Sequence, residues 1–68
     1  MEENKLRLKK YIEHWVEHND EHTDRFRESA EEAEEMGLHE AADALRAAAK
    51  AGIAVSTQLK KAGESIIK

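Results

Sequence analysis

A chain of 68 residues forms one small domain, and at this size a single core rarely gives a stable fold without disulfides, a metal or self-association. The absence of cysteine excludes disulfides and thiolate metal sites. A formal net charge of -4 argues against nucleic-acid binding, which needs a basic surface to neutralise phosphates. Metal binding and self-association therefore remain as sources of extra stability.

The composition predicts a soluble all-α protein. The chain has no proline, 38% charged residues and many Ala, Glu, Lys, Arg and Leu, as in long helices or coiled coils. No apolar run approaches the roughly 18 to 20 residues that span a bilayer, and the start, Met1-Glu2-Glu3, does not resemble a signal peptide. We therefore expect a cytoplasmic protein with no membrane partner.

The first half of the chain predicts one helix over about residues 3–36, because no proline or glycine interrupts it. Its apolar residues recur at alternating steps of four and three, which indicates a seam, the heptad stripe that faces another helix. The predicted seam comprises Leu8, Ile12, Trp15, Asn19, His22, Phe26, Ser29, Ala33 and Met36, widened by Tyr11, Val16 and Ala30. Asn19 and His22 are thus expected at core positions in the middle of an apolar stripe.

A turn is predicted at Gly37-Leu38. A glycine after a helix adopts the left-handed conformation, and the following leucine supplies the hydrophobic contact of such a cap. A second helix is expected over about residues 39–67, antiparallel to the first because the connection is so short. The whole chain, residues 1–68, is then a single helical hairpin.

The seam of the second helix is made mostly of small residues. It comprises Leu38, Ala42, Leu45, Ala49, Gly52, Ser56, Leu59, Gly63 and Ile66. Gly52 and Gly63 each cost about 1 kcal/mol of helix propensity relative to Ala. We interpret them as points of close helix approach, although simple tolerance of the two glycines is an alternative.

Residues equidistant from the turn should face one another in this hairpin. Large residues of the first helix then meet small residues of the second, as close packing requires. The expected pairs are Phe26 with Ala49, His22 with Gly52 and Ile53, Asn19 with Ser56, Trp15 with Leu59 or Lys60, and Ile12 with Gly63.

Two features predict that the hairpin forms a homodimer. An isolated helix pair is rarely stable in water, because each helix buries only one side. The charge is also polarised: the open end carries Lys5, Arg7, Lys9, Lys10, Lys60, Lys61 and Lys68, and the turn end carries Glu28, Glu31, Glu32, Glu34, Glu35, Glu40 and Asp43. Two hairpins packed in opposite directions would pair these ends in a two-fold symmetric four-helix bundle.

His14, His18 and His22 are spaced i, i+4, i+8, and imidazoles at i, i+4 can bind one metal ion. Glu21 is close enough to serve as a ligand or as an acceptor for a ring N–H. Residues 18–22 lie at the midpoint of the first helix, so His18 and His22 of two antiparallel chains would converge near the two-fold axis. Ligation without sulfur suits Zn, Ni, Co or Cu(II). The alternative is a metal-free polar layer that sets the register of the helices.

Enzymatic motifs are not found. No histidine has a glutamate three residues before it, as bundle di-iron sites require, and His39-Glu40-Ala41-Ala42-Asp43 ends in Asp where the zinc-protease motif needs His. We expect His39 to be a surface or capping residue, and Trp15 and Phe26 to be core residues rather than ligand-stacking ones.

The block His14-Trp15-Val16-Glu17-His18-Asn19, with His22, Phe26, Ala33 and Gly37-Leu38, resembles a group of short prokaryotic proteins of unknown function. These proteins are helical hairpins with a His-Trp-(Ile/Val)-Glu-His-Asn-x-x-His block and a Gly-Leu turn. The resemblance spans most of the chain and implies a helical hairpin. It singles out Trp15, His18, Asn19 and His22 without implying an activity.

Three functional hypotheses follow from these patterns. The first is a non-enzymatic, self-associating protein that binds a transition metal through His18 and His22, helped by His14 and Glu21, for metal handling, storage or sensing. The second is a metal-free interaction module whose Asn/His layer sets the dimer register, with an unidentified protein partner. The third is a pH-responsive assembly, because histidines crowded at a two-fold axis repel one another once protonated.

Overall fold

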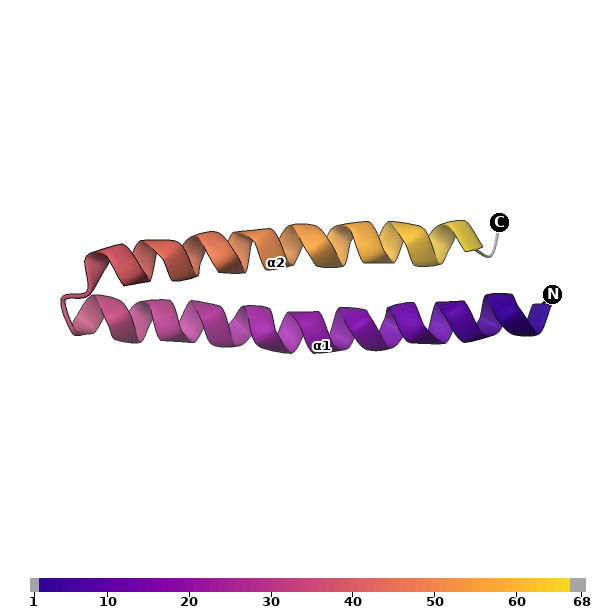
Figure 1. The fold of residues 1–68 in the computed structure, drawn as a ribbon, viewed down its shortest axis with the longest axis horizontal. Coiled ribbons are helices and arrows are strands. Elements are labelled where there is room, and N and C mark those ends of the chain that lie inside the picture. Colours follow the sequence, from indigo (N-terminus) through magenta and orange to yellow (C-terminus); the bar gives the residue numbers. More distant parts are fainter. Residues whose placement is uncertain (1, 67–68) are drawn as a thin grey trace.

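The computed structural model describes residues 2–66 as two α-helices, α1 (Glu2–Glu35) and α2 (His39–Ile66). The helices run antiparallel, side by side, in a rod 53 Å long, so that the start of α1 and the end of α2 lie at the same end (Figure 1). The predicted all-α fold and helical hairpin are confirmed; α1 begins and ends one residue earlier than predicted, and α2 begins at His39 as predicted. Ile67, predicted to be the last helical residue, lies outside the described part of the chain.

The turn between the helices is a Schellman motif. Gly37 adopts the left-handed conformation with φ of 79°. The Leu38 N–H donates to the Ala33 carbonyl at 2.9 Å, and the Gly37 N–H donates to the Glu34 carbonyl at 3.0 Å, so two carbonyls at the end of α1 gain partners. The Leu38 carbonyl then accepts the Ala42 N–H at 2.9 Å, which starts α2.

The seam of α2 is nearly the predicted one. Ala42, Ala49, Gly52 and Ser56 are buried against α1, and the half-buried members are Leu45, Leu59, Gly63 and Ile66. Only Leu38 differs, since it is 52% exposed at the turn. Small residues therefore form the surface on which α1 lies.

The seam of α1 is rotated relative to the prediction. Trp15 is 47% exposed and His22 is also exposed, so neither belongs to the core of the hairpin. Val16 and Thr23, each one residue further along, face α2 in their place. The two possible heptads share Ile12, Asn19, Phe26 and Ala33, so the periodicity alone did not separate them.

The core of the hairpin is small. Its buried apolar residues are Ile12 and the four alanines Ala30, Ala33, Ala42 and Ala49. In contrast, eight large apolar side chains within residues 2–66 are exposed: Leu6, Leu8, Tyr11, Trp15, Met36, Leu38, Ile53 and Val55. Within residues 2–66, neither helix combines the length and the apolar character of a membrane span.

Candidate interaction surface

A polar layer lies inside the hairpin at its middle. The Asn19 side-chain amide donates to the Gly52 carbonyl at 2.7 Å and to Ser56 Oγ at 2.8 Å. The Ser56 hydroxyl in turn donates to Asp20 Oδ1 at 2.5 Å. Because the Gly52 carbonyl can only accept, the amide nitrogen of Asn19 must face α2. The predicted pairing of Asn19 with Ser56 is therefore found, and Asp20 extends it.

Thr23 completes this layer, and the sequence reasoning missed it. Its side chain is buried against Gly52, where an added Cβ atom would collide with Thr23 Oγ1 and lie 3.2 Å from Thr23 Cβ. The Thr23 hydroxyl donates to the Asn19 carbonyl at 2.8 Å, one helical turn back. Gly52 is thus a point of close approach, as predicted, but its neighbour is Thr23 rather than His22. The i+4 spacing of Thr23 from Asn19 is the signal that was available in the sequence.

This layer determines how α1 and α2 are aligned. No buried side-chain nitrogen or oxygen in residues 2–66 lacks a hydrogen-bond partner. A slip of one helix by a single turn would leave the Asn19 amide without its two acceptors, which costs about 1–3 kcal/mol. Asn19 therefore sets the register within one hairpin, and it is separated from His22, which lies outside.

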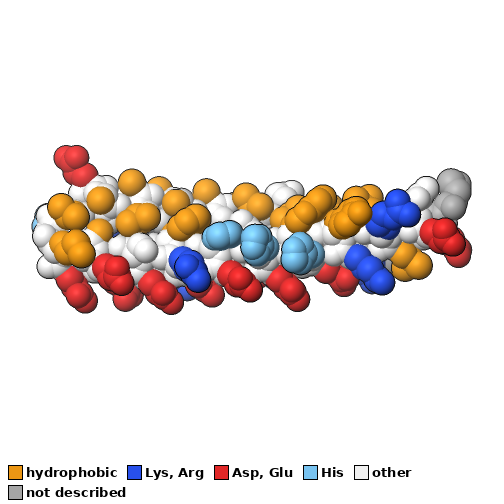
Figure 2. All heavy atoms as spheres, turned by 60° about the horizontal axis from the view of Figure 1, so that its bottom comes forward, with side chains coloured by type: hydrophobic (Ala, Val, Ile, Leu, Met, Phe, Trp, Pro, Cys, Tyr) orange, Lys and Arg blue, Asp and Glu red, His pale blue; other side chains and the backbone are white. Residues whose placement is uncertain are grey.

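Three histidines form a row along the exposed side of α1. The ring centroids of His14 and His18 are 5.7 Å apart with nearly parallel planes, and those of His18 and His22 are 4.9 Å apart with the planes at 72°. The His22 ring also stacks on the half-buried Phe26 at 6.4 Å. Figure 2 shows the three histidines in line, between a band of hydrophobic side chains and a row of acidic ones.

The predicted metal ligands therefore share one exposed helix. Glu21 is exposed as well, on the same helix. Among residues 2–66, no three histidine or acidic side chains are grouped closely enough to hold a metal ion. The three predicted histidine ligands thus lie in a row on one helix and form no closed ligand set within residues 2–66.

The exposed apolar residues of α1 continue the histidine row toward the open end. Leu8, Tyr11 and Trp15 follow the heptad spacing that leads on to His18 and His22, and the Tyr11 and Trp15 rings stack at 6.0 Å. The hydrophobic band above the histidines in Figure 2 extends over α2. We define the Trp15 face as Leu8, Tyr11, Trp15, His18 and His22 of α1 with Ala44, Ala48, Ala51 and Val55 of α2.

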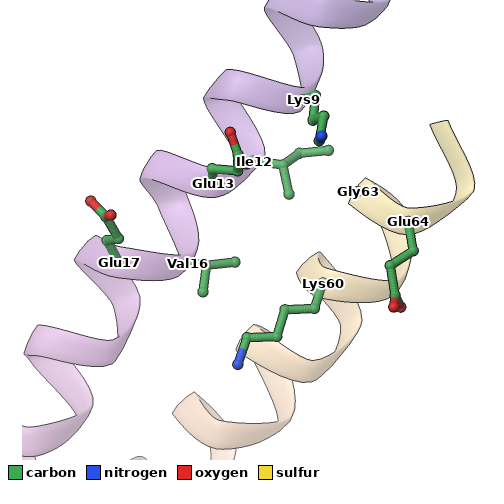
Figure 3. A pocket seen from close by; sticks show the side chains of 8 residues that line it. All are labelled: Lys9, Ile12, Glu13, Val16, Glu17, Lys60, Gly63 and Glu64. Atoms are coloured by element: carbon green, nitrogen blue, oxygen red, sulfur yellow. The ribbon is translucent and has the colours of Figure 1, made fainter. Parts of the chain in front are cut away.

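The other side of the hairpin is more highly charged. A shallow groove between the helices is floored by Ile12, Val16 and Gly63 and bordered by Lys9, Glu13, Glu17, Lys60 and Glu64 (Figure 3). At about 100° per residue, Glu13 and Glu17 lie about 160–200° round α1 from Trp15. The two sides of the hairpin therefore differ in character, and the Trp15 face is the more apolar.

An ion-pair cluster joins the helices beside the turn. Arg46 of α2 donates to Glu34 at 2.6 Å and to Asp43 at 3.1 Å, and the His39 ring also pairs with Glu34. The hydrogen bond from Arg46, followed by that from His39, lowers the pKa of the Glu34 carboxyl below its usual value. The same pair raises the pKa of Arg46. His39 is an exposed residue at the first position of α2, in agreement with the surface or capping role predicted for it.

These features define a class of protein: an antiparallel helical hairpin with one internal polar layer and one uncovered apolar face that carries histidines. The chain belongs to the family described as a domain of unknown function (DUF8180), whose model matches residues 8–66. That match covers both helices and the turn, from Leu8 at the start of the Trp15 face to Ile66 at the end of the α2 seam. Searches of the curated proteins and of the solved structures gave no match.

Proposed function

We propose that the protein is a self-assembling helical module, in which two hairpins pack through their Trp15 faces into an antiparallel four-helix bundle. The observation that carries the proposal is the contrast between the two sides of α1. Four of the five apolar residues that are buried in the described part of the chain are alanines, whereas Leu8, Tyr11 and Trp15 are 45%, 52% and 47% exposed. The side chains best able to stabilise a core by burial are thus on the uncovered side.

The exposed area supports a second copy as the occupant of this face. The hairpin exposes 5528 Å², whereas a compact monomer of 7.7 kDa exposes about 4,300 Å². The excess of roughly 1,200 Å² is larger than the roughly 800 Å² that each partner contributes to a standard stable interface. Packing two such rods face to face would bring the exposed area per chain to that of a compact protein.

The charges support the antiparallel direction. Basic residues cluster at the open end of the hairpin, including Arg7 and Lys10 of α1, and acidic residues cluster at the turn end, including Glu28 and Glu32. Two copies in opposite directions bring each basic end beside an acidic one, whereas parallel copies oppose like charges. The internal Asn19 layer contributes by holding both helices in one register, so that each copy presents the same face.

Sedimentation equilibrium of the chelator-treated protein tests this proposal. We expect a mass of twice 7.7 kDa at micromolar concentration and an unfolding midpoint that rises with protein concentration. Trp15→Glu should weaken association at least about 30-fold, because loss of an interface hot spot costs about 2 kcal/mol or more. Emission from Trp15, the sole tryptophan, should shift to shorter wavelength on association, since the indole leaves water.

The matched control is Ile53→Glu. Ile53 is 51% exposed, close to the 47% of Trp15, but it lies about 160° round α2 from Val55 and so outside the Trp15 face. Its replacement should leave the dimer intact. A monomeric wild-type protein at 100 µM would overturn the proposal, and so would a dimer that is lost with Ile53→Glu and kept with Trp15→Glu.

A further inference from the structure

We propose that His18 and His22 form half of a transition-metal site, which the same two residues of a second copy complete at the two-fold axis. The ligand set would be four imidazole nitrogens, suited to Zn²⁺ and to Co²⁺, Ni²⁺ or Cu²⁺. This inference rests on the antiparallel dimer proposed above and adds a ligand to it.

The spacing of the two rings fits a shared ion. Imidazoles that bind one ion tetrahedrally at Zn–N distances of about 2.0–2.1 Å have ring centroids about 5 Å apart. The His18 and His22 centroids are 4.9 Å apart, with planes inclined by 72°. His14 and His18 are 5.7 Å apart with planes inclined by only 14°, a stacked arrangement that fits a common ion less well. His18 and His22 are therefore the pair assigned to the metal.

The position of His18 and His22 along the rod would bring the histidines of two antiparallel copies close to one another. The hairpin extends from Glu2 to the turn at Gly37, so its midpoint falls at Asn19 and Asp20, between the two histidines. In an antiparallel dimer the two-fold axis passes through that midpoint. His18 of one chain then lies at the level of His22 of the other, within a single helical turn.

The location on the Trp15 face also favours a closed site. Two histidines from one chain leave half of a tetrahedral ion exposed to water, and Trp15 and Phe26 flank the pair on either side along α1. Docking of a second Trp15 face would supply two further nitrogens and exclude water from the ion. Structural zinc sites are four-coordinate and closed in this way.

The test is native mass spectrometry and calorimetric titration of the chelator-treated, untagged protein with Zn²⁺, followed by absorption spectroscopy with Co²⁺. We expect one ion per two chains and the visible absorption of tetrahedral cobalt. His18→Ala and His22→Ala should each weaken Zn²⁺ binding by on the order of 100-fold or more, because even loss of a residue that only supports a ligand costs about 10–100-fold. His14→Ala, the adjacent exposed histidine, is the matched control and should change affinity by less than about threefold.

The outcomes separate this site from the assembly itself. A chelated dimer that takes up no Zn²⁺ overturns the site while the assembly stands. A protein that is monomeric without metal and dimeric with Zn²⁺ upholds the site and overturns metal-free assembly. Binding of one ion per chain at wild-type affinity by a monomeric Trp15→Arg variant, which adds no carboxylate three residues before His18, overturns the shared site, and so does an equal loss of Zn²⁺ affinity with His14→Ala. Circular dichroism confirms that each variant remains helical, which is expected because the substituted residues are exposed and alanine favours helix.

Discussion

Thr23 of α1 fills the space that a side chain at position 52 of α2 would need. We predict that Gly52→Ala destabilises the hairpin by about 1–3 kcal/mol through overpacking, despite a gain of about 1 kcal/mol in helix propensity. Thr23→Ala should relieve most of the clash, so the double variant should be more stable than the sum of the single effects, with a coupling of about 1–3 kcal/mol. Urea unfolding of the wild type, the two single variants and the double variant, all at one protein concentration, measures the four free energies of unfolding that give this coupling.

The control is Gly63→Ala, where an added Cβ would lie 3.5 Å from Ile12 Cγ2, an ordinary contact. That variant should be neutral or more stable by up to about 1 kcal/mol. Strict additivity of Gly52→Ala and Thr23→Ala would contradict the close approach.

The hydrogen bonds of Asn19 to α2 predict that replacing this residue by one of the same shape will lower the stability of the hairpin. In Asn19→Asp a carboxylate oxygen would replace the amide nitrogen that lies 2.7 Å from the Gly52 carbonyl, so two acceptors would face each other. We expect the free energy of unfolding to fall by about 2 kcal/mol or more at neutral pH. Protonation of the new carboxyl restores a donor, so the loss should shrink as the pH falls. Thermal unfolding between pH 7 and pH 4 checks this, with the exposed Asn4→Asp as the control.

The Glu34 cluster predicts how stability changes in acid. The pKa of Glu34 is lower in the folded protein than the ordinary glutamate value of 4.5, mainly because Arg46 donates a hydrogen bond to it. Its contribution to stability is therefore fully present above that value and is lost as the pH falls through the lower folded-state pKa. Glu34→Gln should make the unfolding midpoint depend less on pH in this acid range.

Glu31→Gln is the matched control for that measurement, since Glu31 is an exposed glutamate of the same turn-end cluster and has no ion pair among residues 2–66. It should leave the acid dependence closer to that of the wild type. Identical profiles for the two variants would show that the ion-pair cluster does not couple pH to folding.

The turn predicts that a substitution of Gly37 lowers the stability of the hairpin only through its backbone conformation. Its φ of 79° is unfavourable for residues with a Cβ, and no atom within 4 Å would obstruct an added Cβ. We expect Gly37→Ala to cost about 1–2 kcal/mol and Gly37→Asn to cost less, because asparagine tolerates this conformation better. Denaturant midpoints rank the three proteins, and equal stability of the alanine variant would contradict the capping role.

The sequence by itself determined the helices, the turn and the surface of α2. An uninterrupted helical pattern before Gly37 and after Leu38 leaves little choice of secondary structure, and the glycine defines the cap. The seam of α2 could be predicted because its small residues follow a single heptad pattern. The pairings of Asn19 with Ser56 and of Ile12 with Gly63 followed from counting residues away from the turn.

Only the tertiary structure decided which side of α1 faces α2. Two heptads overlap on α1, because the apolar stripe is wider than one partner helix covers. The shape of α2 selects one of the two heptads. Thr23 fits against the backbone of Gly52, which has no side chain, and Asn19 donates a hydrogen bond to the Gly52 carbonyl. Trp15, His18 and His22 are thereby left on the outside. Periodicity specifies the spacing of a stripe, but complementary packing against the partner determines its rotation, and that rotation places the histidines on the surface available to a second molecule.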